Sequence, residues 1–381
     1  MRVLVTSTPG AGHVLPIVAI ARALRDRGHQ VTWATGSNAH DLVRDAGLSP
    51  IAAGLDLATR NGQFREGWPQ VATIPPRQRR AVMFPALFAT ISARPMYDDL
   101  TRLTQVERPD LILHDPSELA AAPLARRLGI PHVTVGFGGL FPDARLASAI
   151  PELTDLWHEA GSAVPADLGF YDDAYLHPLP PSLEAAPTDR SIHLVRPGGY
   201  DGSDEMVPPT SPRSRASVYA TFGTEFGPVA PWRDVIDALG SLDVDALLTV
   251  GSQVEPASLG PLPTGVRVER WVPQRQALAA ADLLVSHGGS GAMIGAASAG
   301  LPHLVLPLAA DHFENAELIS TQGAGSMLDA KQAGPELMAR TIRHLLDDLD
   351  VRRAASVLTT EIAAMPPPDD LAGMLEALAD S

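Results

Sequence analysis

Two histidines of this chain lie beside glycines, at places where a strand is expected to end and a helix to begin. His13 follows Pro9-Gly10-Ala11-Gly12, and His287 precedes Gly288-Gly289-Ser290-Gly291. Glycines at such places allow a ligand to approach the backbone closely. A neutral imidazole can accept a proton from a hydroxyl, and the positive end of a helix disfavours the charged form. His13 is therefore a candidate general base, although such a histidine taken alone is more often a helix-start or packing residue.

Asp115 is the candidate partner of His13. It stands in Leu113-His114-Asp115-Pro116, where another strand of the same sheet is expected to end. A carboxylate there can hold the second ring nitrogen of the histidine, which fixes the tautomer and stabilises an imidazolium formed during reaction. An aspartate before a proline is also typical of a helix cap, and the residues alone favour the cap.

The segment from Leu283 to Gly291 predicts a strand, a glycine loop and a helix. Free backbone N–H groups and the helix dipole make such a loop an anion site, and its glycines let a diphosphate press against it. The side chains of His287 and Ser290 can add hydrogen-bond donors. A tight turn packed with small residues explains the glycines, but it does not explain the histidine beside them.

Two further segments in the second half carry side chains suited to a nucleotide sugar. From a loop after the expected strand 266–268, Trp271 can stack on a nucleobase and Gln274 can bind ribose hydroxyls. Asp311-His312-Phe313-Glu314-Asn315 follows another strand, where acidic and amide groups can hold sugar hydroxyls. Both segments have a plainer explanation, because a tryptophan near a strand end is more often core and acids are common at helix N-termini.

Other classes of site lack residues that they need. The first glycine loop has Leu15 where a dinucleotide-binding fingerprint needs its third glycine, so a nicotinamide oxidoreductase is disfavoured. The sequence contains no Walker lysine-serine pair. Asp243-Val244-Asp245 has the spacing used by metal-dependent sugar transferases, but it precedes an expected strand rather than following one. We interpret it as a solvated turn and expect no metal site.

The elements that must position these residues form two similar halves. Short β-branched runs alternate with helical patterns from Arg2 to Val135 and again from Ser217 to Leu306, which predicts parallel strands joined by helices. The first strand is expected at Arg2 to Thr6, and a crossover helix is expected at Leu119 to Leu128. The proline-rich segment 178–212 between them is typical of a linker. We therefore expect an α/β chain of two Rossmann-like, doubly wound domains that face each other across a ligand-binding cleft.

The expected domain limits follow from this alternation. The first domain covers residues 1–207 and the second covers residues 213–365. Three consecutive prolines then follow Met365, after which Leu371, Met374, Leu375 and Leu378 recur at helical spacing. Because the prolines redirect the chain, we expect residues 366–381 to form a final helix that returns to the first domain.

Composition and charge narrow the classes of function. Of the 381 residues, 45% are hydrophobic and 19% are charged, as in globular proteins. The formal net charge of -15 repels a phosphate backbone, so we expect no nucleic-acid partner. No leader peptide and no apolar stretch of membrane-spanning length is recognisable, so no membrane partner is expected. A chain without cysteine fits a reducing compartment, and we expect a cytoplasmic protein.

Taken in order, five motifs resemble the inverting GT-B glycosyltransferases of the UDP-glycosyltransferase superfamily. More narrowly, the chain is similar to their bacterial natural-product branch, which decorates polyketides and related antibiotics. The likeness covers nearly the whole chain and is most specific between residues 260 and 316. The motifs are Gly12-His13-Val14-Leu15-Pro16, Phe222-Gly223-Thr224, Trp271-Val272-Pro273-Gln274, His287-Gly288-Gly289-Ser290-Gly291 and Asp311-His312-Phe313-Glu314-Asn315-Ala316.

The resemblance implies a role for each of these motifs. His13 would be the general base and Asp115 its partner, in an N-terminal domain that binds the acceptor. The C-terminal domain would bind a nucleotide-diphosphate sugar as co-substrate, with neither a metal nor another cofactor, and the reaction would invert the anomeric configuration. The implied donor-binding residues are Thr224, Trp271, Val272, Gln274, His287, Gly289, Ser290, Gly291, Asp311 and His312.

Two departures from the family bear on the donor. Ala292 stands where the family usually has threonine or serine, which removes one possible phosphate contact. His312 stands where glutamine usually follows the aspartate, which alters recognition of the sugar. A deoxysugar carried on dTDP therefore fits this branch better than glucose does.

The acceptor is expected to be a small hydrophobic aglycone, aromatic or macrocyclic. Apolar side chains of the first domain, Phe84, Phe88, Met83 and Phe137, can line its pocket, although core packing explains them about as well. The oligomeric state is expected to be a monomer or a homodimer. Two rival functions are a sugar-nucleotide epimerase, which would need no acceptor, and a non-catalytic helper subunit, which would lack a working base.

Overall fold

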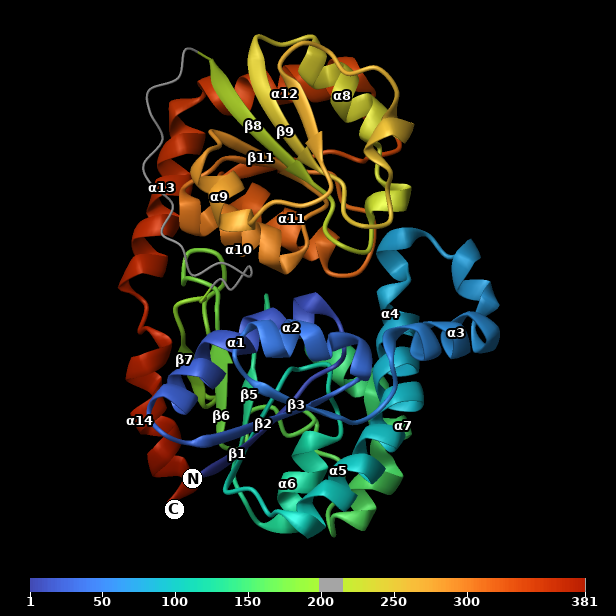
Figure 1. The fold of residues 1–381 in the computed structure, drawn as a ribbon, viewed down its shortest axis with the longest axis vertical. Helices are drawn as coiled ribbons and strands as arrows, with labels where there is room; N and C mark the ends of the chain where they lie inside the picture. Colours follow the sequence, from blue (N-terminus) through green and yellow to red (C-terminus); the bar gives the residue numbers. More distant parts are fainter. Residues whose placement is uncertain (199–214, 381) are drawn as a thin grey trace. The chain divides into compact units, whose positions relative to one another are not determined.

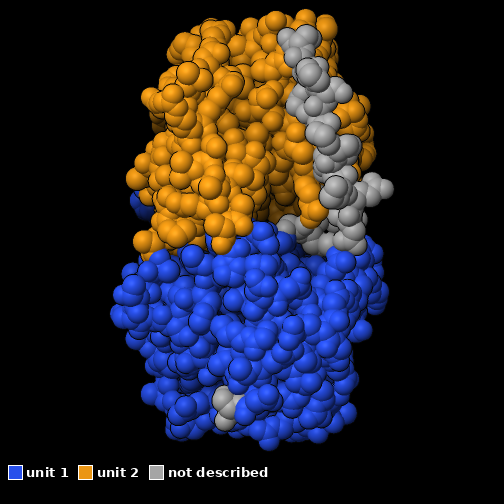
Figure 2. Space-filling view, turned by 90° about the vertical axis from the view of Figure 1, so that its left-hand side faces the viewer, with its two compact units in different colours: residues 1–178, 186–200, 365–381 blue, residues 179–185, 201–364 orange. Residues whose placement is uncertain are grey.

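The computed structural model of this chain describes residues 1–198 and 215–380, and it divides into two compact units. Unit 1 contains residues 1–178, 186–200 and 365–381, and unit 2 contains residues 179–185 and 201–364 (Figure 2). The limits that the sequence suggests near 207 and 213 lie outside the described residues. Each unit has its own sheet and its own core.

Unit 1 is built on a parallel sheet with the strand order β3-β2-β1-β4-β5-β6-β7 (Figure 1). Its central strands are short, apolar runs buried on both faces, which is typical of parallel sheets covered by helices. The strands are β1 (Arg2–Thr6), β2 (Gln30–Thr35), β3 (Ser49–Ala52), β4 (Leu111–His114), β5 (His132–Val135), β6 (Ala174–His177) and β7 (Ile192–Leu194).

The helices of unit 1 cover both faces of this sheet. Because side chains alternate along a strand, Val3 and Val5 enter one core cluster while Leu4 enters another. Helices α1, α2 and α14 pack into the first cluster, and α5, α6 and α7 pack into the second. The helices are α1 (Ala11–Asp26), α2 (His40–Asp45), α3 (Leu57–Gly67), α4 (Arg80–Phe84), α5 (Arg94–Val106), α6 (Ala121–Leu128), α7 (Asp143–Glu159) and α14 (Pro368–Ala379).

Helix α14 belongs to unit 1 although it follows unit 2 in the sequence. It packs beside α1 (Figure 1), and its Leu371 and Leu375 are buried in the same core cluster as α1. At the surface, Arg27 donates two hydrogen bonds to the carboxylate of Glu376, at 2.8 and 2.6 Å. These bonds hold the pKa of Glu376 down at about 2.

A π-helix, η4 (Pro85–Ala93), joins α4 to α5. The hydroxyl groups of Thr90 and Ser92 each donate to the carbonyl five residues earlier, as this wider helix allows. Such segments occur often at functional sites. Shorter 3-10 turns are η1 (Ser37–Ala39), η2 (Pro69–Thr73), η3 (Pro76–Gln78), η5 (Gly227–Val229) and η6 (Pro256–Leu259).

Unit 2 repeats the architecture with the parallel strand order β10-β9-β8-β11-β12-β13. Its strands are β8 (Ala216–Thr221), β9 (Val244–Thr249), β10 (Val266–Glu269), β11 (Leu283–Ser286), β12 (His303–Val305) and β13 (Gly325–Met327). Its helices are α8 (Trp232–Gly240), α9 (Gln274–Ala279), α10 (Ser290–Ala299), α11 (His312–Thr321), α12 (Pro335–Asp347) and α13 (Leu349–Ala364).

Each sheet has one point where the strand order reverses. In unit 1 this point lies between β1 and β4, and in unit 2 it lies between β8 and β11. In open parallel sheets, ligands bind beyond the carboxyl ends of the strands at this point. The structure therefore confirms the predicted α/β class with two doubly wound units. Of the helices within the described residues, none has the length and apolar character needed to cross a bilayer.

Candidate active site

The structure brings His13 and Asp115 into contact at the reversal point of unit 1. Thr6 and His114 are paired at the ends of β1 and β4, so the two following loops leave the sheet side by side. His13 lies in the first turn of α1, and its Nδ1 is 3.0 Å from Oδ1 of Asp115. Asp115 is buried, whereas the His13 side chain is 21% exposed. The predicted pair thus has the geometry of a base held by a carboxylate.

Backbone amides hold the Asp115 carboxylate in place. The amide of Thr8 donates to its Oδ2 and the amide of Ser117 donates to its Oδ1, each at 2.8 Å. Because the carboxylate accepts, His13 donates from Nδ1, and Nε2 then carries the lone pair that can take a proton. Asp115 therefore closes a local turn, and α6 begins only at Ala121, so the helix-cap alternative does not describe it.

Nothing in the sequence pointed to Thr8 and Ser117. Both donate to Asp115 from their backbone N–H groups, which every residue except proline carries, and the Thr8 hydroxyl adds a longer bond of 3.5 Å. Only the path of the chain in the folded unit decides which amide meets a carboxylate.

Aromatic side chains surround the His13 ring. The centre of the Phe137 ring lies 5.0 Å from the centre of the His13 ring in an edge-on arrangement, and the centre of the Phe88 ring lies 5.8 Å from it. Both phenylalanines are partly buried. Two of the four predicted acceptor residues are therefore neighbours of the candidate base.

The other two predicted acceptor residues, Met83 and Phe84, belong to α4. Phe84 is 3% exposed and packs against Phe88 and Phe141 in the core, so core packing accounts for it. Met83 is half-buried in α4. Arg60 of α3, which the sequence did not single out, is buried and has its guanidinium 5.4 Å from the centre of the Phe88 ring.

In unit 2, the loop between β11 and α10 has a shape that requires its glycines. Gly288 has a φ of +83°, and a Cβ there would lie 2.5 Å from a methyl group of Val305. A Cβ on Gly289 would lie 2.6 Å from Nε2 of His287. Gly289 also caps α10 without a side-chain hydrogen bond, so no capping side chain competes with an anion for the amides at the start of this helix.

The His287 imidazole is neutral in this loop. It is 7% exposed, and burial together with the nearby His312 ring lowers its pKa to about 3. The two ring centres are 4.4 Å apart. His287 can therefore offer a hydrogen bond but no positive charge, and any anion held here depends on backbone amides and the helix dipole.

Ser290 and Asp311 are joined in one buried hydrogen-bond network. The Ser290 hydroxyl donates to Oδ2 of Asp311 at 2.5 Å. Nδ2 of Asn315 lies 3.0 Å from the same Asp311 oxygen, 3.1 Å from the Ser290 hydroxyl and 2.8 Å from the Gly288 carbonyl. Asn315 is the amide side chain of the segment that the sequence suggested for sugar hydroxyls, and its spacing of four residues from Asp311 places both on one helix face.

His312 is buried beside the glycine loop, with only 2% of its surface exposed. The amide of Ala309 donates to its Nδ1 at 3.1 Å, so the ring proton sits on Nε2. Phe226, which the sequence did not point to, contacts the ring edge-on at 4.6 Å. The orientation of this histidine is therefore fixed by its surroundings.

The remaining predicted donor residues are spread over neighbouring loops. Trp271 is 62% exposed after β10, so it is not a core residue, and Gln274 at the start of α9 lies against Gly295 of α10. Thr224 is exposed after β8, Gly291 is exposed in the first turn of α10, and Val272 is partly buried. The structure brings Gln274 to the helix that begins at Ser290, whereas Trp271 projects into solvent.

Neither unit carries an obvious metal centre in its described part. Within residues 1–198 and 215–380, no three or more His, Asp or Glu side chains are grouped so as to hold a metal ion. Asp243, from the metal-like motif, is exposed and pairs with Arg215 directly before β9 begins. That position agrees with the interpretation of a solvated turn.

Family models identify both halves of the chain. Residues 22–146 match the N-terminal domain and residues 233–378 match the C-terminal domain of the family described as "Erythromycin biosynthesis protein CIII-like". The first match covers the strands and helices around Asp115, and the second covers the glycine loop of unit 2.

Curated relatives and solved structures agree with these matches. An L-demethylnoviosyl transferase of Streptomyces niveus is 34% identical, over 86% of this chain and 85% of the relative. The elloramycin glycosyltransferase ElmGT of Streptomyces olivaceus is 32% identical, over 98% and 97%. The glycosyltransferase SsfS6 of Streptomyces sp. SF2575, solved with thymidine diphosphate, is 25% identical with a TM-score of 0.80, over 99% of each chain.

These matches span both units and include relatives above 30% identity over most of the chain. They agree with the motifs that the sequence carries and with the two doubly wound sheets. The chain therefore belongs to the natural-product branch of the UDP-glycosyltransferase superfamily and has its two-domain GT-B fold.

Proposed function

We propose that this glycosyltransferase moves a deoxysugar from a dTDP-linked donor to a hydrophobic natural-product aglycone, with inversion at the anomeric carbon. The observation that carries the proposal is the 3.0 Å contact between His13 Nδ1 and the buried Asp115 carboxylate, beside two aromatic rings. A base oriented in this way can activate a hydroxyl nucleophile.

The proposed reaction is a single displacement. Nε2 of His13 takes the proton of an acceptor hydroxyl while the acceptor oxygen forms a bond to the anomeric carbon. The bond between that carbon and the donor phosphate oxygen breaks, and the nucleoside diphosphate leaves with the electron pair. Asp115 stabilises the imidazolium that forms, because its negatively charged carboxylate accepts a hydrogen bond from Nδ1–H and stays ionised. One displacement inverts the configuration.

The leaving diphosphate is assigned to the glycine loop of unit 2. The first-turn amides of α10 and the helix dipole favour negative charge, and the glycines leave room for a phosphate at the backbone. Donors that are already oriented stabilise charge developing on the leaving group. We propose on this basis that transfer needs neither a metal nor another cofactor.

The nucleotide and the acceptor follow from two supporting observations. A related glycosyltransferase was solved with thymidine diphosphate, and two curated relatives are named L-demethylnoviosyl transferase and elloramycin glycosyltransferase. Phe88 and Phe137 offer apolar and aromatic contacts next to His13. An aglycone whose hydroxyl group lies at the edge of an aromatic or macrocyclic ring matches these contacts.

A product assay tests the proposal directly. The purified chain is incubated with dTDP-deoxysugars and a panel of phenolic and macrolide acceptors, with and without a metal chelator. We expect a glycoside by mass spectrometry, inverted configuration by NMR, and no loss of rate with the chelator. Conversion of the sugar without any acceptor would instead indicate an epimerase, and retained configuration or chelator sensitivity would contradict the proposed mechanism.

A binding assay separates the nucleotide from the acceptor. Ligands that bind only the folded state raise its melting temperature, so dTDP, UDP and GDP can be ranked without knowing the aglycone. We expect the largest shift with dTDP. A larger shift with UDP or GDP would overturn the assignment of the donor nucleotide.

A further inference from the structure

Glu118 is a buried acid that the proposed reaction does not use. It is 2% exposed and lies three residues after Asp115, in the turn that leads into α6. Its own amide donates to the Asp115 carbonyl at 3.0 Å, which closes that turn. A buried acid is costly unless its polar atoms are matched, so its contacts are informative.

The two oxygens of Glu118 bind different parts of unit 1. Oε2 accepts a 2.6 Å hydrogen bond from the hydroxyl of Thr6, the last residue of β1. Oε1 accepts a 2.8 Å bond from the amide of Ala120, directly before α6. Glu118 therefore links the turn that carries Asp115 to the strand from which the His13 loop leaves the sheet.

The hydrogen bond from Thr6 to Glu118 lies at the point where the backbone pairing of β1 with β4 ends. Thr6 and His114 form the last paired position of β1 and β4, and beyond it the chains separate. Past that point the connections are the Thr6 hydroxyl to Glu118, the Thr8 amide and hydroxyl to Asp115, and Asp115 to His13. Each of these connections depends on the carboxylate of Glu118 or Asp115, and both acids are buried.

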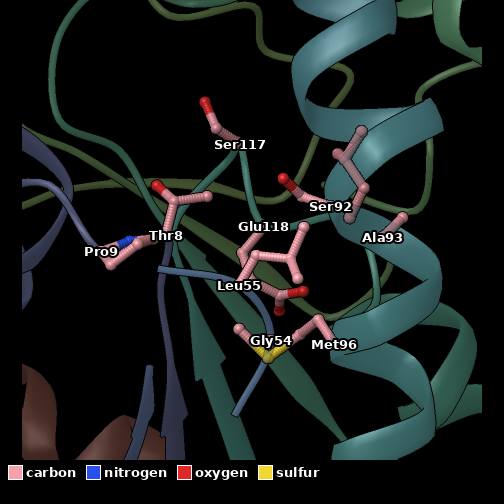
Figure 3. Close-up of a pocket in the computed structure, with 10 residues that line it drawn as sticks. Thr8, Pro9, Gly54, Leu55, Ser92, Ala93, Met96, Ser117 and Glu118 are labelled. Carbon is pink, nitrogen blue, oxygen red and sulfur yellow. The ribbon is translucent and has the colours of Figure 1, made fainter. Parts of the chain in front are cut away.

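Glu118 also lines a small pocket together with the residues that hold Asp115. The pocket is bordered by Thr8 and Ser117, whose amides bind the Asp115 carboxylate, and by Ser92 and Met96 of the neighbouring helices (Figure 3). Shortening the Glu118 side chain would enlarge this pocket and open the Thr8–Asp115 contact to water.

We infer that Glu118 is a positioning residue for the candidate dyad, holding the Asp115 turn against β1 so that the carboxylate stays within reach of His13. This inference rests on the proposed function only for its effect on rate. The hydrogen bond between the Thr6 hydroxyl and Glu118, called the tie below, is a property of the folded unit and can be observed without a substrate.

The alternative is that Glu118 only stabilises the start of α6 through Ala120. Burial, with a contribution from the nearby Asp115 charge, raises the pKa of Glu118 to about 7. A neutral amide at this position therefore resembles the protonated acid, and it can still accept from Ala120 and donate to Thr6. Glutamine is the variant that keeps both links, whereas alanine removes both.

The experiment compares variants that break the tie with variants that preserve it. Glu118→Ala and Thr6→Val remove the link, and Glu118→Gln and Thr6→Ser retain it. Thr104→Val is the matched control, because Thr104 is buried in α5 and its hydroxyl donates to the Leu100 carbonyl away from the dyad. Steady-state transfer kinetics are combined with the proton NMR signal of His13 Nδ1–H, identified by its loss in His13→Gln.

We expect Glu118→Ala and Thr6→Val to lower kcat by about tenfold to a hundredfold, since a small misplacement of catalytic groups costs about this much. The acceptor KM should stay within about twofold, and the Nδ1–H signal should shift or broaden. Glu118→Gln, Thr6→Ser and Thr104→Val should keep both the rate and the signal.

An unchanged kcat and an unchanged Nδ1–H signal in folded Glu118→Ala or Thr6→Val would overturn the inference, as would an effect confined to the acceptor KM. If Glu118→Ala does not fold, Thr6→Val decides the question, because it leaves the acid in place. If the wild-type chain transfers no sugar, the proposed function fails, while the NMR comparison still tests the tie.

Discussion

The glycine loops before α1 and before α10 both combine glycines with a histidine, but the two histidines differ in exposure and in the group that they contact. His13 lies inside the first turn of α1, keeps 21% of its side chain exposed and is bound to a carboxylate. His287 lies between β11 and α10, is 7% exposed, and faces the His312 ring. The two histidines therefore differ in their position relative to the following helix. His13, inside the helix, can exchange a proton, whereas His287, before the helix, shapes a binding loop.

Charge explains why the two conditions suit different tasks. A histidine base needs a partner that accepts a hydrogen bond from its second ring nitrogen, and the Asp115 carboxylate does this for His13. A diphosphate loop needs oriented donors, and a neutral histidine wedged against Gly289 keeps that loop in one shape. Four sets of variants test whether the two histidines differ in this way.

The largest effect is expected at the base. His13→Ala should lower kcat by about a hundredfold to ten-thousandfold, because general base catalysis contributes about that much. Binding of dTDP, followed by thermal shift, should not change. His158→Ala, at an exposed position of α7, is the control and should match the wild type. Near-normal turnover of His13→Ala at saturating donor would contradict the assignment of His13 as the general base.

The second effect is expected at the glycine loop. Gly289→Ala places a Cβ 2.6 Å from the His287 ring and should weaken dTDP binding about tenfold, which equals about 1.4 kcal/mol. Gly334→Ala is the matched control, since Gly334 also caps a helix with a similar φ and has open space around it. Titration calorimetry gives both affinities. Equal affinities for the two variants would show that the shape of the loop does not matter.

The third effect concerns acid stability. The pKa of His287 is about 3 in the folded chain, well below its ordinary value, so below pH 6.5 the unfolded state binds a proton that the folded state does not. Stability should therefore fall as the pH decreases from about 6.5 toward 3, by about 1.4 kcal/mol per pH unit for this group. Urea unfolding at several pH values should show a shallower fall for His287→Gln. His158→Gln should keep the wild-type slope.

The smallest effect is expected at the exposed tryptophan. Trp271→Ala should weaken dTDP binding by about 1 kcal/mol through loss of stacking on the base, with little change in stability because the side chain is 62% exposed. Leu349→Ala, an exposed apolar position of α13, should affect neither quantity. An unchanged affinity for Trp271→Ala would assign the nucleobase to another part of unit 2.

Several elements could be predicted closely from the sequence. The expected strand Arg2–Thr6 is β1, and the strand before the second glycine loop is β11. The helix expected from Leu119 begins at Ala121 instead, because Asp115 and Glu118 hold the preceding residues in a turn. Such side-chain to backbone bonds compete with helix formation and leave little trace in apolar periodicity.

Part of the candidate site could also be predicted from the sequence. His13 and Asp115 stand out because their types and their places after expected strands suit a base and its partner. Thr8 and Ser117 bind Asp115 mainly through their backbone amides, and Asn315 acts through a network that requires the fold of the loop before it. The exposure of Trp271 and the burial of Phe84 likewise depend on which surfaces the core covers.

Local patterns in the sequence specify the order of strands, loops and helices and the residue types available in each loop. They do not specify that residues 102 positions apart form the dyad, which requires β1 to pair with β4 on one side as well as with β2 on the other. Strand pairing depends on long-range hydrogen bonds and shared burial, which local periodicity does not specify. Tertiary packing likewise gives His13 a carboxylate partner and buries His287, which keeps the His287 ring neutral.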